Sequence, residues 1–159
     1  MNLAFFSKLP LGLALFMGLA FSSPLAAQNV EAIGTVMKTQ GFVYKKKSGE
    51  KKYNLTSPNI PFSEQDHLKT TKKSTAILRL EGGFQLKMIP ETMLVVRQEP
   101  TKEEPMLIFS LDKGGVFIHT LKGAENSMKT RGFQARMGKV TVRGTEGKIF
   151  IARQNDKHV

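Results

Sequence analysis

The chain of 159 residues contains no cysteine. Disulfide bonds and thiolate metal ligands are therefore excluded. A lipid-modified cysteine near the N-terminus is excluded for the same reason. The fold must instead be held together by burial of apolar side chains and by strand pairing, which is feasible for a domain of this length.

Long apolar runs are also scarce. The run from Leu9 to Phe21 follows a segment with one positive charge, Lys8, and precedes the small residues Ser22 to Ala27. It is short for a membrane-spanning helix, which needs about 20 apolar residues. This order of charged, apolar and small residues is typical of a secretory signal peptide. We expect cleavage after Ala27, with cleavage after Ala26 as the second choice and retention as an N-terminal anchor as the alternative.

The expected mature domain spans residues 28–159, with a core at about 33–151. No apolar segment within it is long enough to cross a membrane. We therefore expect a protein secreted across the inner membrane and located in the bacterial periplasm.

Acidic residues are few. The chain has 24 Lys and Arg residues against 13 Asp and Glu residues, and loss of Lys8 with the signal peptide leaves a net charge of +10. A basic surface attracts polyanions. Outside the cytoplasm these are lipid phosphates, anionic wall polymers or acidic proteins, so no nucleic acid partner is expected. The alternative is that the charge serves only solubility.

Helical periodicity is missing from the mature chain, whereas alternation of apolar and polar residues recurs between turn signals. The pattern predicts an all-β, single-domain antiparallel sandwich or roll of about ten to twelve short strands. Glycine-containing turns predict three hairpins. Their turns lie at residues 81–83, 112–115 and 138–139.

The second of these hairpins pairs Leu107–Leu111 with Val116–Leu121. The third pairs Phe133–Met137 with Val140–Arg153, which we interpret as one closing strand with a bulge at Gly144–Gly147, because glycine within a strand often marks a bulge. Gly138-Lys139 suits a type II′ turn.

Residues for catalysis are sparse. His67, His119 and His158 show no metal-binding spacing, and no catalytic nucleophile motif is present. His67 follows Asp66 directly, and adjacent strand residues point to opposite faces, so they do not form a pair. We expect no enzyme activity, no cofactor and no metal. The alternative, an unrecognised enzyme, would need a pocket joining Asp66, His67 or Arg143 to a second carboxylate.

Lysines cluster in two segments of the first half of the domain. A hairpin tip and a strand with its following turn together form the candidate surface for an anion or partner. Its residues are Lys45, Lys46, Lys47, Lys51, Lys52, Lys69, Lys72 and Lys73. Because lysines at the tip repel one another, we expect the tip to be solvated.

Several short motifs follow one another in a fixed order: Gly-x-Val twice, Asp-x-Leu-x-Thr, Ser-x-Ala-x-Leu, Pro-x-Thr-x-Leu, a leucine before a glycine hairpin, and Val-Arg-Gly-Thr. They begin at Gly34, Gly41, Asp66, Ser74, Pro90, Leu111 and Val142. The ordered set resembles the FecR domain family of bacteria over roughly Ile33 to Ile151. The sequence departs from the family pattern at Gln65, where members usually have glycine, and at Gly82-Gly83 and Gly147.

The resemblance implies an extracytoplasmic β-domain used for binding or signalling. The sigma-factor regulator role of the best-known members is not carried over, because their cytoplasmic segment and spanning helix have no counterpart here. The signature Val142, Arg143, Gly144 and Thr145 is interpreted as structural, with Glu81 or Glu146 as carboxylate partners of Arg143; a partner-binding role of Arg143 stays open. The expected function is non-catalytic binding or scaffolding, and the alternative is an accessory of an envelope signalling pathway that acts by protein–protein contact.

Overall fold

The computed structural model of the chain describes residues 31–99, 106–121, 132–145 and 147–153. The expected signal peptide and its cleavage positions lie outside this part. The described residues form twelve strands and one 3-10 turn, which confirms the all-β prediction, and they include no helix that could span a membrane. The elements are β1 (Ala32–Gln40), β2 (Val43–Lys46), β3 (Asn54–Leu55), β4 (Ile60–Ser63), β5 (His67–Thr70), β6 (Thr75–Leu80), η1 (Glu81–Gly83), β7 (Phe84–Met88), β8 (Met93–Glu99), β9 (Met106–Thr120), β10 (Gly132–Met137), β11 (Val140–Gly144) and β12 (Lys148–Arg153).

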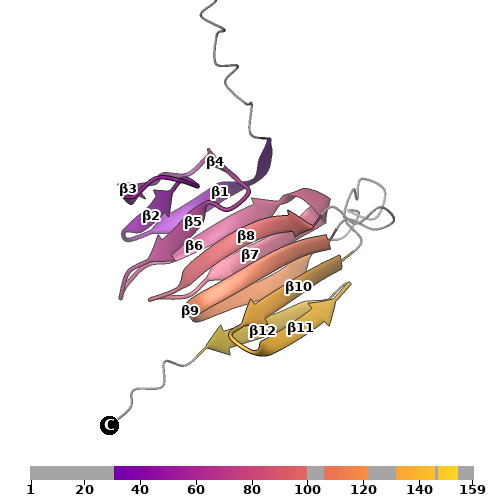
Figure 1. Cartoon of the computed structure of the whole chain (residues 1–159). Helices are drawn as coiled ribbons and strands as arrows, with labels where there is room; N and C mark the ends of the chain where they lie inside the picture. Colours follow the sequence, from indigo (N-terminus) through magenta and orange to yellow (C-terminus); the bar gives the residue numbers. More distant parts are fainter. Residues whose placement is uncertain (1–30, 100–105, 122–131, 146, 154–159) are drawn as a thin grey trace, which may run out of the picture.

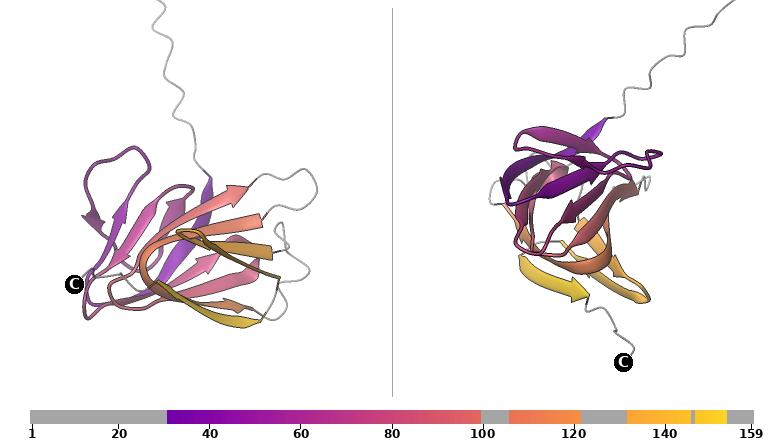
Figure 2. Two further views of the ribbon diagram at one scale, coloured as in Figure 1. Left: turned by 60° about the horizontal axis from the view of Figure 1, so that its bottom comes forward. Right: turned by 90° about the vertical axis from the view of Figure 1, so that its left-hand side faces the viewer.

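The strands form a curled sheet whose two halves pack against each other (Figures 1 and 2). We call the half with the order β4-β1-β6-β7-β9-β12 sheet A, and the half with the order β3-β2-β5-β8-β9-β10-β11 sheet B. Only β10 lies parallel to its neighbour β9 among the described strand pairs; the other pairs are antiparallel. The long strand β9 belongs to both halves.

The hairpin β6-η1-β7 forms as its alternation predicts. Ala76, Leu78 and Leu80 are buried on β6, and the side chains at the same face of β7 are buried too. Gly82 and Gly83 take φ of 75° and 74°. That left-handed conformation is readily reached by glycine, which explains the turn.

The predicted hairpin at residues 112–115 is wrong, because β9 continues through it as one bent strand. Its first part pairs with β8 and β10 in sheet B, and its last part pairs with β7 and β12 in sheet A. Asp112 is an extra residue relative to β8, where Leu94 faces Leu111 and Met93 faces Lys113. Bulges and bends are the usual means by which a strand changes sheets. Figure 2 shows the curvature of β9.

The closing segment also differs from the prediction of one bulged strand. Val140–Gly144 is strand β11, which pairs with β10 in sheet B, whereas Lys148–Arg153 is β12, which pairs with β9 in sheet A. The segment between them crosses from one half to the other. The hairpin of β10 and β11 is present as predicted, and its Gly138 takes φ of 58°.

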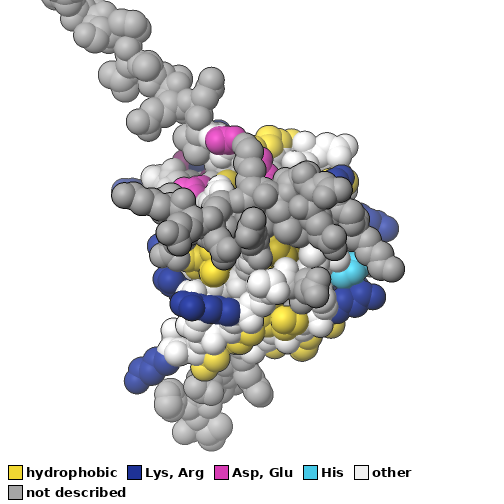
Figure 3. All heavy atoms as spheres, turned by 90° about the vertical axis from the view of Figure 1, so that its right-hand side faces the viewer, with side chains coloured by type: hydrophobic (Ala, Val, Ile, Leu, Met, Phe, Trp, Pro, Cys, Tyr) yellow, Lys and Arg dark blue, Asp and Glu magenta, His cyan; other side chains and the backbone are white. Residues whose placement is uncertain are grey.

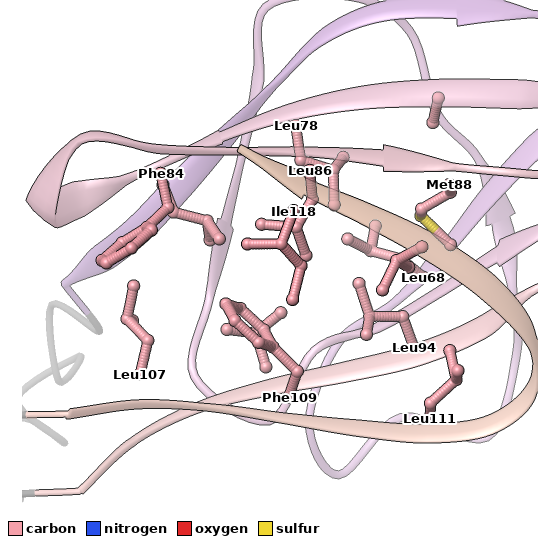
Figure 4. Packing of buried hydrophobic residues seen from close by; sticks show 14 of the residues in the cluster. Leu68, Leu78, Phe84, Leu86, Met88, Leu94, Leu107, Phe109, Leu111 and Ile118 are labelled. Carbon is pink, nitrogen blue, oxygen red and sulfur yellow. The ribbon is translucent and has the colours of Figure 1, made fainter. Parts of the chain in front are cut away.

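The core lies between the two halves. Figure 4 shows side chains of both halves pointing toward one another: Leu78, Leu86 and Ile118 from sheet A, and Leu68, Leu94 and Phe109 from sheet B. The Phe133 ring packs edge-on against Phe84 with 5.9 Å between centroids. Burial of one such large apolar side chain contributes about 1.5–3 kcal/mol to stability.

Candidate anion-binding surface

The eight lysines of the predicted surface are distributed over several parts of the fold, and Lys45 faces inward. Its Nζ donates a hydrogen bond to the backbone oxygen of Pro61 at 2.8 Å and lies 3.9 Å from Oδ2 of Asp66. Its side chain is 15% exposed. Lys45 shares a face with Val43 and Leu68, which explains why it is separated from the solvated lysines.

Lys46 and Lys69 meet above one aromatic ring on the outer face of sheet B. The Nζ of Lys46 lies 5.4 Å from the centroid of Tyr53, and the Nζ of Lys69 lies 5.8 Å from it. Both lysines are half-buried. A cation near an aromatic face is stabilised by about 0.5–1 kcal/mol at exposed sites. Burial, and secondly the charge of Asp112, raise the pKa of the Tyr53 hydroxyl, so the ring stays neutral at pH 7.

His67 lies beside Lys46 on the same face and experiences its charge. The residue is opposite Lys46 on β2 and opposite Val95 on β8. Burial lowers the pKa of His67, and the charge of Lys46 lowers it further. Asp112 opposes this shift, while Arg97 adds a smaller lowering and Asp66 a still smaller rise. The largest cause is burial, and the effect of Lys46 shows that this ammonium group lies close enough to His67 to disfavour its protonation.

A polar hollow adjoins Lys69. It has a volume of about 280 Å³ and is lined by Lys69, Thr70, Thr71, Lys72, Glu91, Met93 and Lys113. The Nζ of Lys113 lies 3.4 Å from Oε1 of Glu91, and both side chains are exposed. Three lysines and one carboxylate therefore line the hollow, and one of the lysines, Lys113, is paired with that carboxylate. Lysines in excess over carboxylates suit a small oxyanion.

The remaining predicted lysines are exposed at opposite ends of β5. Lys47, Lys51 and Lys52 lie on the tip between β2 and β3, next to the start of β5. Lys72 and Lys73 lie on the turn after the end of β5. We use the name Tyr53 surface for Lys46, Tyr53, His67, Lys69 and Arg97 together with the adjoining hollow.

Arg97 and Lys113 also belong to this surface, although neither was expected there from the sequence. Arg97 lies on the outer face of β8, two positions after Val95, and alternation along a strand could have indicated it. Lys113 comes to the hollow only because β9 bends at this point and brings it opposite Met93.

Four polar residues of the resemblance motifs are buried at corners of the fold. They are Asp66, Thr70, Ser74 and Thr92. Oγ1 of Thr70 accepts the N–H of Thr92 at 3.0 Å, and Oγ of Ser74 accepts the N–H of Phe42 at 2.8 Å. These side chains satisfy backbone groups where the chain changes direction.

The residues of the signature Val142–Thr145 also make local contacts. Val142 packs against the core, and a Cβ at Gly144 would lie 2.7 Å from the ring of Phe133. Nε of Arg143 donates to Oε1 of Gln134 at 2.9 Å. The observed partner of Arg143 is therefore an amide on the paired strand, where a carboxylate of Glu81 or Glu146 was expected; Glu146 lies outside the described residues.

The other residues considered for catalysis or metal binding do not come together in one site. His119 is half-buried on the outer face of sheet A, and His158 lies outside the described residues. Within the described ranges, no group of three His, Asp or Glu side chains is placed to hold a metal ion.

No protein-family model matches the chain, and no curated protein or solved structure is significantly similar to it.

Proposed function

We propose that the chain is a non-catalytic, FecR-like binding or scaffolding domain that engages an anionic component of the bacterial envelope through the Tyr53 surface. The observation that carries this proposal is the convergence of Lys46 and Lys69 on the Tyr53 ring, beside a histidine whose pKa is lowered. Cations gathered near one ring are stabilised when an anion binds beside them. A partner that presents carboxylates or phosphates, either along an extended chain or on a flat surface, matches such a sheet face.

The proposed location is the periplasm, after removal of residues 1–27. It rests on the order of charged, apolar and small residues at the N-terminus. The FecR-like assignment rests on the motif order. Support comes from Gln65, which stands where the family usually has glycine and takes φ of 62°, a conformation that favours glycine.

The first test measures binding of the mature chain, residues 28–159, to polyglutamate and to phosphatidylglycerol vesicles. We expect binding to at least one of them that weakens steeply with added NaCl, because exposed charges are screened within about 10 Å at 0.1 M salt. The two probes distinguish a carboxylate polymer from a phosphate-bearing lipid surface. Binding that does not weaken with salt would contradict the proposal.

The position of the site is tested by two double variants with the same change in net charge. Lys46→Glu with Lys69→Glu should weaken binding at least about tenfold, because it places carboxylates beside the approaching anion. Lys47→Glu with Lys51→Glu, at the exposed tip, is the matched control and should weaken binding far less. Equal losses would show that only net charge matters and would remove the Tyr53 surface from the proposal.

A second candidate function is an accessory of an envelope signalling pathway that adds a strand to a partner protein. The observation that favours it is the position of β11, which pairs only with β10 within the described chain and has an exposed Val140. Unpaired strand edges are the groups that β-augmentation uses. Crosslinking of the mature chain in its own envelope tests it. A Thr141→Pro variant should lose the captured protein, because alternate N–H groups of β11 face away from β10 and proline removes one of them.

A further inference from the structure

The outer face of sheet A carries an aromatic pair that is open to solvent. Phe117 on β9 and Phe150 on β12 stack with 4.3 Å between ring centroids and an interplanar angle of 29°. They remain 45% and 51% exposed. The stacked rings add a side-chain contact between the paired strands β9 and β12. Much of both rings nevertheless remains exposed to water. Exposed apolar groups gathered on one face often mark an interaction site.

The strand register arranges this face in two rows across β6, β7, β9 and β12. Residues at Cα-paired positions form the first row, Ile77, Lys87, Phe117 and Phe150, and the second row, Arg79, Gln85, His119 and Lys148. The first row is largely apolar and aromatic, whereas the second row is polar and basic. The face is therefore amphipathic along the strands, with a basic residue, Lys87, in its apolar row.

A groove of about 490 Å³ follows these rows. Its lining includes Ile77, Lys87, Phe117, His119, Lys148 and Phe150. This volume lies in the range of about 300–1,000 Å³ that is usual for small-molecule sites. No carboxylate is among the described residues that line the groove, so the Lys87 and Lys148 ammonium groups have no acidic neighbour in its wall. In Figure 3 a band of hydrophobic side chains runs along the lower part of the view, with Lys and Arg side chains to its left and right.

We infer that this groove binds a single-chain amphiphile with an anionic head group. The apolar chain lies along Phe117 and Phe150, where it removes their exposed surface from water. The head group lies at the basic row, within reach of Lys148 and with His119 as a hydrogen-bond donor or acceptor. Charge complementarity favours this occupant over a second copy of the chain, because two copies of this face would bring lysines together.

The sequence offers a direct reporter for this site, because the chain contains no tryptophan. In a Phe150→Trp variant, monomeric dodecyl phosphate, kept below its micelle-forming concentration, should cause a saturable blue shift of the emission. Inorganic phosphate, which has the head group alone, and dodecyl maltoside, which has the chain with a neutral head, should cause little change. Lys87→Glu with Lys148→Glu in the same background should weaken the dodecyl phosphate response at least about tenfold.

A Leu55→Trp variant is the matched control on the far edge of sheet B, where Leu55 is exposed and faces Tyr44. Its emission should not respond to the dodecyl chain, so the experiment separates this groove from the Tyr53 surface. An equal response of both reporters, or an equal response to dodecyl maltoside, overturns the inference. So does a Phe150→Trp response to phosphatidylglycerol vesicles without a response to the monomer, which would identify membrane docking. If neither Phe150→Trp nor Phe117→Trp responds to dodecyl phosphate, the inference fails while the proposed function stands.

Discussion

Two glycines with the same backbone conformation have different surroundings. Gly114 and Gly49 both take φ of 79°. A Cβ added at Gly114 would lie 2.5 Å from Oγ1 of Thr92 and 2.7 Å from the backbone oxygen of Glu91, whereas a Cβ at Gly49 meets nothing within 4 Å. Thr92 cannot withdraw easily, because its buried Oγ1 accepts the N–H of Gly115 at 3.0 Å. The bend of β9 therefore depends on the absence of a side chain at Gly114.

We predict that Gly114→Ala lowers the free energy of unfolding by about 2–5 kcal/mol, since overpacking costs about 1–3 kcal/mol and the left-handed conformation about 1–2 kcal/mol. Urea denaturation measures the change. Gly49→Ala is the control and should cost only the conformational part, about 1–2 kcal/mol. Equal losses in the two variants would mean that the packing around Thr92 yields and that the bend is not fixed by this contact.

At the scale of elements, Asp66 joins β4 of sheet A to the neighbouring strands β2 and β5 of sheet B. Its carboxylate accepts the N–H of Ser48 at 3.1 Å, on the tip after β2, and the N–H of Ser63 at 3.0 Å, at the end of β4. Lys45 lies 3.9 Å from the same carboxylate. The residue itself precedes β5 and is 4% exposed. One buried carboxylate therefore connects the edges of both halves.

We predict that Asp66→Asn destabilises the protein by about 1–3 kcal/mol, because the amide nitrogen of asparagine cannot accept the second backbone N–H and leaves it unsatisfied. Thermal or urea unfolding checks this value. Asp112→Asn, at an exposed position of β9, should change stability by less than about 0.5 kcal/mol. A loss in Asp66→Asn no larger than in Asp112→Asn would show that the tip and β4 hold their positions without the carboxylate.

The hairpins β6-β7 and β10-β11 could be predicted because alternation and a glycine turn are both local signals. The path of β9 could not, because Asp112–Gly115 carries the same signal as a tight turn. Whether the chain folds back or changes sheets there depends on where β8, β10 and β12 supply partners, which is a property of the whole fold. The separation of β11 from β12 was missed for the same reason.

The candidate surface was predictable only in part. Segments rich in lysine are visible in the sequence, but Val43-Tyr44-Lys45-Lys46 does not say that Lys45 faces inward. Its burial depends on Asp66 and Pro61, which come from other elements. Tyr53 was not singled out because nothing local brings its ring close to Lys46 and Lys69.

At the scale of the whole molecule, the excess of positive charge acts at distances beyond single contacts. On the outer face of sheet B, the charges of Lys46 from β2 and Arg97 from β8 act on His67 together with the opposing charge of Asp112 from β9. The imidazole of His67 therefore reports the local potential without any added label. An anion bound at the Tyr53 surface should raise the pKa of His67, because it offsets the positive charges that lower it.

The pKa of His67 lies below its usual 6.5, first through burial and then through Lys46. Lys46→Ala should raise this pKa, yet leave it below 6.5 because burial persists, and NMR titration of the imidazole measures it. Since the folded state binds the proton less tightly than the unfolded state, the His67 contribution to stability is lost as pH falls from about 6.5 toward the folded pKa, and less of it is lost in Lys46→Ala. Lys73→Ala, on the turn at the other end of β5, should leave the pKa unchanged. A shift as large in Lys73→Ala would mean that His67 responds to net charge and does not sense the cations beside it.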